Sequence, residues 1–482
     1  MFESARPTTL EKPRGSPRTL AVICAVGVGI RLALLLIAGE LELQSDEANY
    51  AYLALVWERF GFYSDSYRFI WPPGFVWLMT LSLRWFGSDG LFALKLLQVA
   101  ASASTGWYLM QIARRLFCDR TAHIAGVLWC VYLPLVAYTH YLWPEPLFLA
   151  LFTPALYHTL RVLQCPEREP GIDRHLLSAG VLFALALYLK ESPLYLLGLL
   201  ALALVALARV RAEGLRRASL LLLVVVACVT PWTLHNLEVY GRFVPLGSTL
   251  GENCFNGLNA RYKNYDILPL SWHRELDLPA ELSRTWFVEH DPEAGWDRAE
   301  ELRNTPDRLA ENTRRGLAFA AAQPGWLARS RVKKLGDLVA PTSFFIRHTA
   351  LGHYRDTPLG GDLIRRLLVA WALCCPLVLI PLGLAGLLGS LRDRAGLTLS
   401  TLVLSYFALT SLLVAMSRFR VPVLPLLIVL AAGLLARGLD LAGRRGRVLA
   451  GLALLGTVLV FLFWVDLPET LTLVRLAWEG AL

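Results

Sequence analysis

Blocks of about twenty apolar residues recur along the chain, and most of them are joined by short loops that contain arginine. A helix of this length crosses the ~30 Å hydrocarbon core of a bilayer. Only 18% of the 482 residues are charged. Soluble proteins average about 25%, so this chain has too little charge to cover a surface that faces water. The sequence therefore predicts an all-α polytopic membrane protein.

We expect about eleven transmembrane helices, with a range of roughly ten to thirteen. The predicted spans cover residues 19–38, 90–112, 121–142, 145–163, 175–189, 192–210, 215–237, 367–390, 396–416, 422–439 and 448–465. A further apolar stretch, 72–86, contains Arg84 and has only 15 residues, which cover ~22 Å as a helix. We therefore interpret 72–86 as an interfacial or re-entrant helix on the outer side.

The arginines predict the orientation of the chain. If 72–86 does not cross, every short arginine-rich loop falls on the side of the N-terminus, and the positive-inside rule assigns that side to the cytoplasm. These loops contain Arg114, Arg115, Arg120, Arg168, Arg174, Arg209, Arg211, Arg216, Arg217, Arg392, Arg394, Arg437, Arg444, Arg445 and Arg447. The formal net charge of +9 then reflects membrane topology, and nucleic acid is not an expected partner. We expect a multi-pass protein of the inner (plasma) membrane.

The order of spans and loops predicts five regions. They are a cytoplasmic N-terminus (1–18), an N-terminal transmembrane catalytic module (19–237) that includes a first outer loop (39–89), a large outer, periplasmic loop domain (238–362), a C-terminal transmembrane module (363–466) and an outer C-terminal tail (467–482). The large loop is too long for a simple connection, so we expect a folded domain that is mixed α/β or α-rich. The first outer loop is predicted to be helical and interfacial.

The first outer loop carries the sharpest local signal, Ser45-Asp46-Glu47-Ala48-Asn49-Tyr50. Such a run is typical of a helix N-terminus, where serine and acidic residues cap the first turn. Two adjacent carboxylates just outside the first span are also candidates for acid–base chemistry. The pattern alone leaves both interpretations open.

Other ionisable or polar residues are predicted at the same outer face, at the ends of separate spans. They are Glu145, Lys190, Glu191, His235, Asn236, Arg418 and Arg420. Each alone is explained by an interface anchor or a snorkelling side chain, but intramembrane charges that gather at one depth indicate a functional site. A carboxylate can accept a proton, and lysine or arginine can hold a phosphate. These residues therefore suggest group transfer from a lipid phosphate.

The membrane interface explains one further set of residues, and the role of Arg31 is left open. Trp71, Tyr141 and Trp143 fall at predicted membrane interfaces, where an aromatic belt accounts for them without any function. Arg31 lies in the outer half of the first span. It either snorkels outward or pairs with a carboxylate, and the sequence leaves this open.

At these residues the sequence resembles the membrane-embedded glycosyltransferases of the C superfamily (GT-C), and in particular the branch of family 39 with protein O-mannosyltransferases and the aminoarabinose transferases of lipid A. The matching motifs are Asp46-Glu47-Ala48-Asn49-Tyr50, Trp71-Pro72-Pro73-Gly74, Trp143-Pro144-Glu145-Pro146, Pro231-Trp232-Thr233-Leu234-His235-Asn236 and Arg418-Phe419-Arg420-Val421-Pro422-Val423-Leu424-Pro425. Their order and their shared side of the membrane are specific, and they extend over most of the chain.

The resemblance implies an inverting transfer of a sugar from a polyprenyl-phosphate carrier to an acceptor hydroxyl. It makes Asp46 the catalytic base, with Glu47 in support or as a substitute, and gives Glu145 the task of orienting the acceptor or the base. The remaining candidates are assigned to substrate binding: Tyr50, Lys190, Glu191, His235, Asn236, Arg418 and Arg420. The acceptor would be a lipid-linked glycan, a cell-wall polymer or a protein.

The same resemblance implies that no bound cofactor is required. Some relatives carry an acidic–basic pair before the proline that opens the second helix, and here Ile70-Trp71 stands in its place. A divalent metal is therefore not indicated. Many relatives also have arginine where this chain has His235.

Three other functions remain as alternatives. A transporter or flippase of lipid-linked saccharides would place ionisable groups near the membrane midplane and would show repeat symmetry. An inactive membrane scaffold would tolerate Asp46→Asn. An O-antigen polymerase or ligase would rely on arginine and histidine in a large outer loop rather than on an early acidic pair.

Overall fold

The computed structural model describes residues 16–43, 46–60, 71–165, 170–247, 323–391, 394–412, 415–437 and 467–480, with scattered positions at 258, 307–322 and 451–457. All regular elements in these residues are α- or 3-10 helices. The predicted all-α membrane fold is therefore confirmed for the described part of the chain. Most of the large outer loop, Ser45, and most of the predicted span 448–465 lie outside the described residues.

The first span illustrates how local sequence sets the helix ends. Helix α1 (Pro17–Ala38) begins after Ser16, whose side chain accepts a 3.2 Å hydrogen bond from the Arg18 N–H. Proline at the first helical position costs no hydrogen bond, because that N–H has no partner inside the helix. The helix ends at Gly39, which has φ +66°, a conformation that glycine adopts without strain.

In the described residues, nine further helices join α1 in the bundle. These are α4 (Gly90–Leu116), α5 (Asp119–Val131), α7 (Glu145–Gln164), α8 (Ile172–Leu189), α9 (Leu194–Ala206), α10 (Arg211–Tyr240), α16 (Asp362–Gly389), α17 (Arg394–Ser411) and α18 (Leu424–Ala436). Among the described residues, six helices are long and apolar enough to cross a bilayer, or seven with one bent pair. The shorter apolar helices are α9 and residues 396–411. The expected total of about eleven spans stays a prediction.

The bent pair corrects one predicted span. Residues 121–142 were predicted as one span, but α5 ends at Val131 and the segment Leu133–His140 turns away from it by 61°. This segment consists of α6 (Leu133–Ala137) and the 3-10 turn η2 (Tyr138–His140). Pro134 explains the break, because proline has no N–H to donate and its ring clashes with the preceding helical turn.

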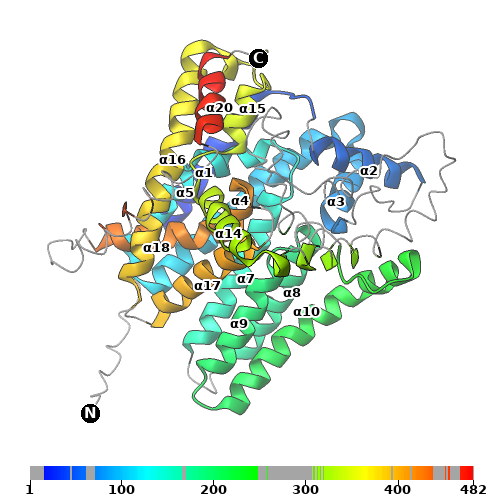
Figure 1. Ribbon diagram of the computed structural model, residues 1–482, viewed down its shortest axis with the longest axis vertical. Coiled ribbons are helices and arrows are strands. Elements are labelled where there is room, and N and C mark those ends of the chain that lie inside the picture. Colours follow the sequence, from blue (N-terminus) through cyan, green and yellow to red (C-terminus); the bar gives the residue numbers. More distant parts are fainter. Residues whose placement is uncertain are drawn as a thin grey trace.

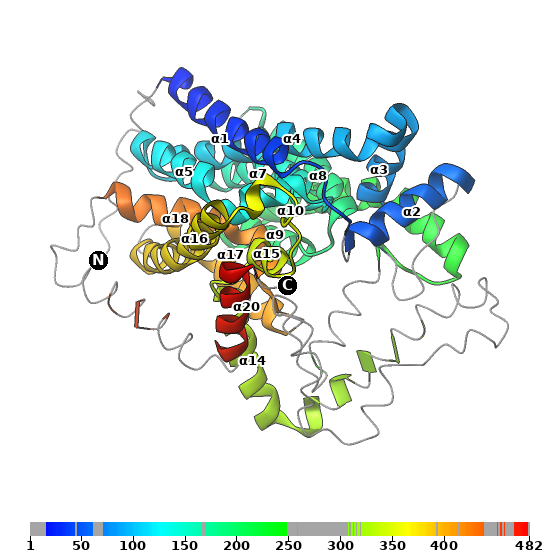
Figure 2. The same cartoon turned by 90° about the horizontal axis from the view of Figure 1, so that it is seen from above.

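Helix α4 lies at the centre of the bundle and contacts α1, α5, α7 and α18. Figure 1 shows α8, α9 and α10 grouped at one end, with α2 (Asp46–Phe60) and α3 (Pro73–Phe86) paired to one side. Figure 2 shows α14 (Pro324–Val339) extending away from the bundle. The 14-residue α3 covers only about 21 Å, as expected for a helix that does not cross.

The C-terminal residues form an additional helix, α20 (Leu467–Glu479). It lies along α16 and the short helix α15 (Phe344–Ala350), as Figure 1 shows. Arg365 on α16 fixes this contact, since its side chain donates to the Trp478 carbonyl oxygen at 3.2 Å. Helix α20 thus packs against α15, which itself borders the charged cluster described below.

Contacts between helix ends define two opposite ends of the bundle. Lys190 at the C-terminus of α8 contacts Glu145 at the N-terminus of α7. At the other end of α8, Asp173 accepts from Arg216 in the first turns of α10 at 3.0 Å. The far ends of α4, α7, α8, α10 and α18 carry basic residues: Arg114, Arg115, Arg161, Arg174, Arg211, Arg216, Arg217 and Arg437. The arginines therefore gather at the end opposite the Glu145–Lys190 pair.

Close packing of α16 on α18 generates a first prediction. A Cβ atom added to Gly386 would lie 2.2 Å from the Leu430 carbonyl oxygen, which is backbone and cannot move aside. Gly386→Ala should force the two helices apart and lower the free energy of unfolding by about 1–3 kcal/mol. Gly389→Ala on the same helix is the matched control, because nothing lies within 4 Å of its added Cβ. Thermal unfolding of both variants in detergent checks this, and equal stability would contradict the close approach.

Candidate active site

Four charged residues from four separate elements meet at one end of the bundle. Asp46 is the first residue of α2, and Glu145 is the first residue of α7, where Pro144 and Pro146 fix the helix start. Lys190 caps the C-terminus of α8, and Arg418 lies in the 3-10 helix η5 (Ser417–Val423) before α18. Acidic residues at helix N-termini and a lysine at a C-terminus also suit the helix dipoles.

Arg418 is the centre of this cluster. Its Nε donates to Glu145 Oε1 and its Nη2 donates to Glu145 Oε2 at 3.2 Å, so the two groups form a bidentate pair. Its Nη1 donates to Asp46 Oδ2. Lys190 Nζ adds a 2.7 Å bond to Glu145 Oε1. One guanidinium thus holds both carboxylates, and a second cation supports one of them.

The two carboxylates differ in burial. The Glu145 side chain is 0% exposed, whereas that of Asp46 is 28% exposed. The charges of Asp46, Glu145, Lys190 and Arg418 sum to zero, which makes their burial tolerable. Burial lowers the pKa of the Lys190 ammonium, and the Glu145 carboxylate opposes that shift. The cluster therefore presents Asp46 to incoming molecules and keeps Glu145 inside the protein.

Aromatic side chains hold the cluster in place. The Arg418 guanidinium lies over the Trp143 ring, 4.2 Å from its centroid, a favourable cation–π geometry. Tyr50 is buried against Trp71, with ring centroids 4.6 Å apart, and its hydroxyl bonds to Arg418. Burial raises the pKa of the Tyr50 hydroxyl well above its usual value, so it acts as a neutral polar group. The expected aromatic belt is wrong for Trp143, which is only 1% exposed.

Glu47 has a different environment from Asp46. It is 2% exposed, and its Oε1 accepts a 2.7 Å hydrogen bond from the Leu142 N–H. This bond ties α2 to the segment before α7. Gln98 on α4 holds the same segment through the Tyr141 carbonyl oxygen at 2.7 Å. The geometry therefore suits Glu47 for positioning and Asp46 for contact with a substrate.

A buried group of tyrosine and histidine residues adjoins this segment and was not found from the sequence. The Tyr354 hydroxyl lies 2.7 Å from His140 Nε2 and 2.5 Å from the Tyr141 hydroxyl. The His348 ring packs edge-on against Tyr141, with centroids 4.7 Å apart. Burial holds the pKa of His348 well below its usual value and lowers that of His353 to about 4. Both histidines are therefore neutral at neutral pH.

Several predicted site residues lie elsewhere. Arg420 donates from Nη1 to the carbonyl oxygens of Leu338, at 3.3 Å, and of Ala340, at 2.5 Å, so it caps the C-terminus of α14. Asn236 donates to the Val244 carbonyl oxygen at 2.9 Å and fixes the turn after α10. His235 stacks on Trp232, with centroids 4.6 Å apart.

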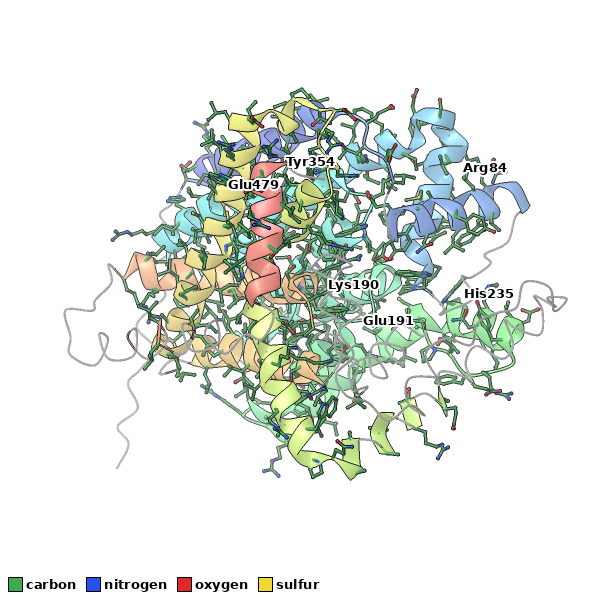
Figure 3. All side chains as sticks on the ribbon, turned by 45° about the horizontal axis from the view of Figure 1, so that its top comes forward. Arg84, Lys190, Glu191, His235, Tyr354 and Glu479 are labelled. Atoms are coloured by element: carbon green, nitrogen blue, oxygen red, sulfur yellow. The ribbon has the colours of Figure 1, made fainter. Side chains whose placement is uncertain are left out.

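Figure 3 shows where the labelled candidates lie. His235 lies on the outlying part of α10, away from Lys190, whereas Glu191 lies next to Lys190. Glu191 is buried, and its backbone carbonyl oxygen accepts from the Leu194 N–H at 3.0 Å. Among the predicted residues, the contacts described above therefore join Asp46, Glu145, Lys190, Arg418 and Tyr50 in one cluster.

Arg31 neither reaches solvent nor needs to snorkel. It is 1% exposed, donates to the carbonyl oxygens of Gly27 at 2.9 Å and Trp129 at 3.2 Å, and lies over the Trp129 ring. With Thr105 and Glu145 it lines a cavity of about 10 Å³, which holds one water molecule at most.

Comparison with known proteins shows which proteins the chain is similar to. Residues 71–235 match the family model described as dolichyl-phosphate-mannose-protein mannosyltransferase. The oligosaccharyltransferase of Archaeoglobus fulgidus in its apo form has 12% sequence identity and a TM-score of 0.52, with 96% of this chain and 56% of that chain covered. The same enzyme with a tethered acceptor peptide gives 12% identity, a TM-score of 0.50, and coverage of 96% and 55%.

ArnT from Cupriavidus metallidurans bound to undecaprenyl phosphate has 17% identity and a TM-score of 0.42, with coverage of 89% and 80%. The chain spans about half the length of the oligosaccharyltransferase structures that it matches. A search of curated proteins gives no sequence match. The predicted resemblance to the GT-C class is thus confirmed, in fold across the chain and in the family model over 71–235.

The buried ion pairs generate a second prediction. Glu145→Gln leaves Lys190 and Arg418 facing a neutral group in a buried site, which should cost about 3–5 kcal/mol of unfolding free energy. Adding Lys190→Met should restore part of that loss, because one unpaired cation is removed.

Glu213→Gln is the matched control for this cycle. Glu213 also contacts two arginines, Arg216 and Arg217, each at 2.8 Å, but its side chain is 23% exposed. This variant should cost less than about 1 kcal/mol. Thermal and denaturant unfolding in detergent measures all of these variants, and additive losses in the double variant would contradict a coupled cluster.

Proposed function

We propose that the protein is a membrane glycosyltransferase that moves a sugar from a polyprenyl-phosphate carrier to an acceptor hydroxyl. The observation that carries this proposal is one guanidinium, Arg418, that binds a partly exposed carboxylate, Asp46, beside a second cation, Lys190. A proton acceptor and two phosphate-binding cations are the groups that such a displacement needs. The match to a family that uses dolichyl-phosphate-mannose supports a lipid-phosphate donor.

The proposed reaction is a single displacement with inversion. Asp46 accepts the proton of the acceptor hydroxyl as its oxygen forms a bond to the anomeric carbon. The bond from that carbon to the phosphate oxygen breaks, and the carrier phosphate leaves with the electron pair. Arg418 and Lys190 stabilise the charge that develops on the phosphate. The reaction requires no cofactor. The transferred sugar is a hexose or pentose.

We infer that the site faces the periplasm or exterior of an inner (plasma) membrane. Arg161, Arg174 and Arg216 lie at the end of the bundle opposite Glu145 and Lys190. The positive-inside rule assigns the arginine-rich end to the cytoplasm. The acceptor is then a lipid-linked glycan, a cell-wall polymer or a protein on the outer side. The oligosaccharyltransferase of similar fold has a tethered acceptor peptide, which supports the protein among these three acceptors.

The third prediction tests the base. Purified protein is incubated with short-chain polyprenyl phosphosugars and candidate acceptors, and release of polyprenyl phosphate is measured. Asp46→Asn should lower turnover by at least about a hundredfold, because loss of a general base costs that much. Asp89→Asn is the matched control, since Asp89 is an exposed aspartate of the same outer loop. Equal turnover by wild type and Asp46→Asn would contradict the proposed role of Asp46 as the base. Translocation of the carrier without release of polyprenyl phosphate would favour a flippase.

The fourth prediction concerns Tyr354, which holds the segment that carries Leu142 and Trp143. Tyr354→Phe keeps the ring but removes the hydroxyl between His140 and Tyr141. Displacement of catalytic groups by about 1 Å costs up to about a hundredfold in rate, so kcat should fall while the KM for the carrier changes little. Tyr188→Phe is the control, because the Tyr188 hydroxyl bonds only to a carbonyl of α10 in the described residues. Unchanged kcat would exclude a positioning role.

A further inference from the structure

We propose that Arg418 couples proton transfer to departure of the carrier phosphate, because Asp46 and the phosphate compete for the same guanidinium. Arg418 Nη1 donates to Asp46 Oδ2. An anionic phosphate displaces Asp46 from it, and the freed carboxylate then acts as the base. This inference rests on the proposed function and adds a rule for the donor: its leaving group must be anionic.

The geometry favours displacement of Asp46 over displacement of Glu145. Glu145 receives two N–H groups of Arg418 and a 2.7 Å bond from Lys190, and it is fully buried. Asp46 receives one N–H group and is 28% exposed. Trp143 lies against the guanidinium plane and fixes its orientation. An incoming anion therefore meets the bond between Arg418 and Asp46 first.

Charge balance gives the same order of events. The four charged groups of the site sum to zero, so a phosphodiester adds one net negative charge. Two anions in contact with one Arg418 N–H repel each other, and the more exposed one is released to water at the lowest cost. A neutral sugar or alcohol cannot displace Asp46, because it offers no charge in exchange. Asp46 thus stays paired with Arg418 until an anionic donor binds.

The chemical step then completes the exchange. The acceptor proton moves to Asp46, which becomes neutral and loses its attraction for Arg418. The carbon–oxygen bond to the phosphate breaks, and the phosphate gains one unit of negative charge. Neutral Asp46 no longer competes for Arg418, so Arg418 stays bound to that phosphate while its charge rises. Release of the phosphate, and of the proton from Asp46, restores the starting ion pair.

Binding of farnesyl phosphate to the full-length protein in detergent tests this competition. Asp46→Asn should bind farnesyl phosphate about tenfold or more tightly than the wild type, although the same variant loses turnover. Asp89→Asn, which removes an aspartate of the same loop, should bind like the wild type. Farnesol, which has no charge, should bind equally to all three proteins. Equal or weaker binding of farnesyl phosphate to Asp46→Asn would overturn the proposal.

The Arg418→Lys variant tests whether Arg418 is the group for which Asp46 and the phosphate compete. Arg418→Lys keeps a positive charge but has a single nitrogen, so it lacks the planar fork through which Arg418 bonds to Glu145 and Asp46 at once. In this background Asp46→Asn should no longer tighten the binding of farnesyl phosphate. Tightening of the same size would overturn the role of Arg418.

The outcomes separate this inference from the proposed function. If Asp46→Asn lacks turnover but shows no tighter binding of farnesyl phosphate, the competition is wrong and the transfer reaction stands. If Asp46→Asn turns over like the wild type, the proposed base is wrong, whatever the binding shows.

Discussion

The bidentate pair of Arg418 and Glu145 is the contact on which the rest of the structure depends. These residues lie 273 positions apart, so the pair joins the N-terminal and C-terminal halves of the bundle. Lys190 adds α8 to the same point. Burying charges is costly, and a buried cation or carboxylate without its partner is far less stable than the complete cluster. The ends of α7, α8 and η5 are therefore held at one depth.

The sequence predicted that these charged residues lie on the same side of the membrane, but it did not predict which of them contact one another. Glu145 and Lys190 come at the ends of apolar blocks, so the parity of the spans was sufficient to place both on the same side. Arg418 and Arg420 looked equivalent, because both follow one span and precede the next. They lie on a 3-10 helix, where a step of two residues is a rotation of about 240°, so their side chains point about 120° apart. Arg418 therefore reaches Glu145, and Arg420 reaches the end of α14.

Two features could not be predicted from local patterns. The acidic pair Asp46 and Glu47 gave no basis for a choice, because adjacent residues on a helix point about 100° apart and only tertiary contacts decide which one is buried. The contact of Tyr354 with His140 joins residues 214 positions apart, and no periodicity connects them. Pro134 was visible, but the continuous apolar run around it favoured an unbroken span. That prediction rested on the length and hydropathy of the run, whereas the helix breaks next to the proline.

That break has a direct consequence for the cluster. A straight helix through residues 121–142 would carry Leu142 and Trp143 onward along the axis of α5, away from Glu47 and Arg418. The 61° turn at Tyr132 instead brings the segment back over the bundle, where Leu142 meets Glu47 and Trp143 meets Arg418. Fixed contacts thus surround Glu145 and Arg418, whereas Asp46 is held by one bond at an exposed edge. Such a division, with a rigid buried anchor and one carboxylate at the opening, suits a stationary site for chemistry.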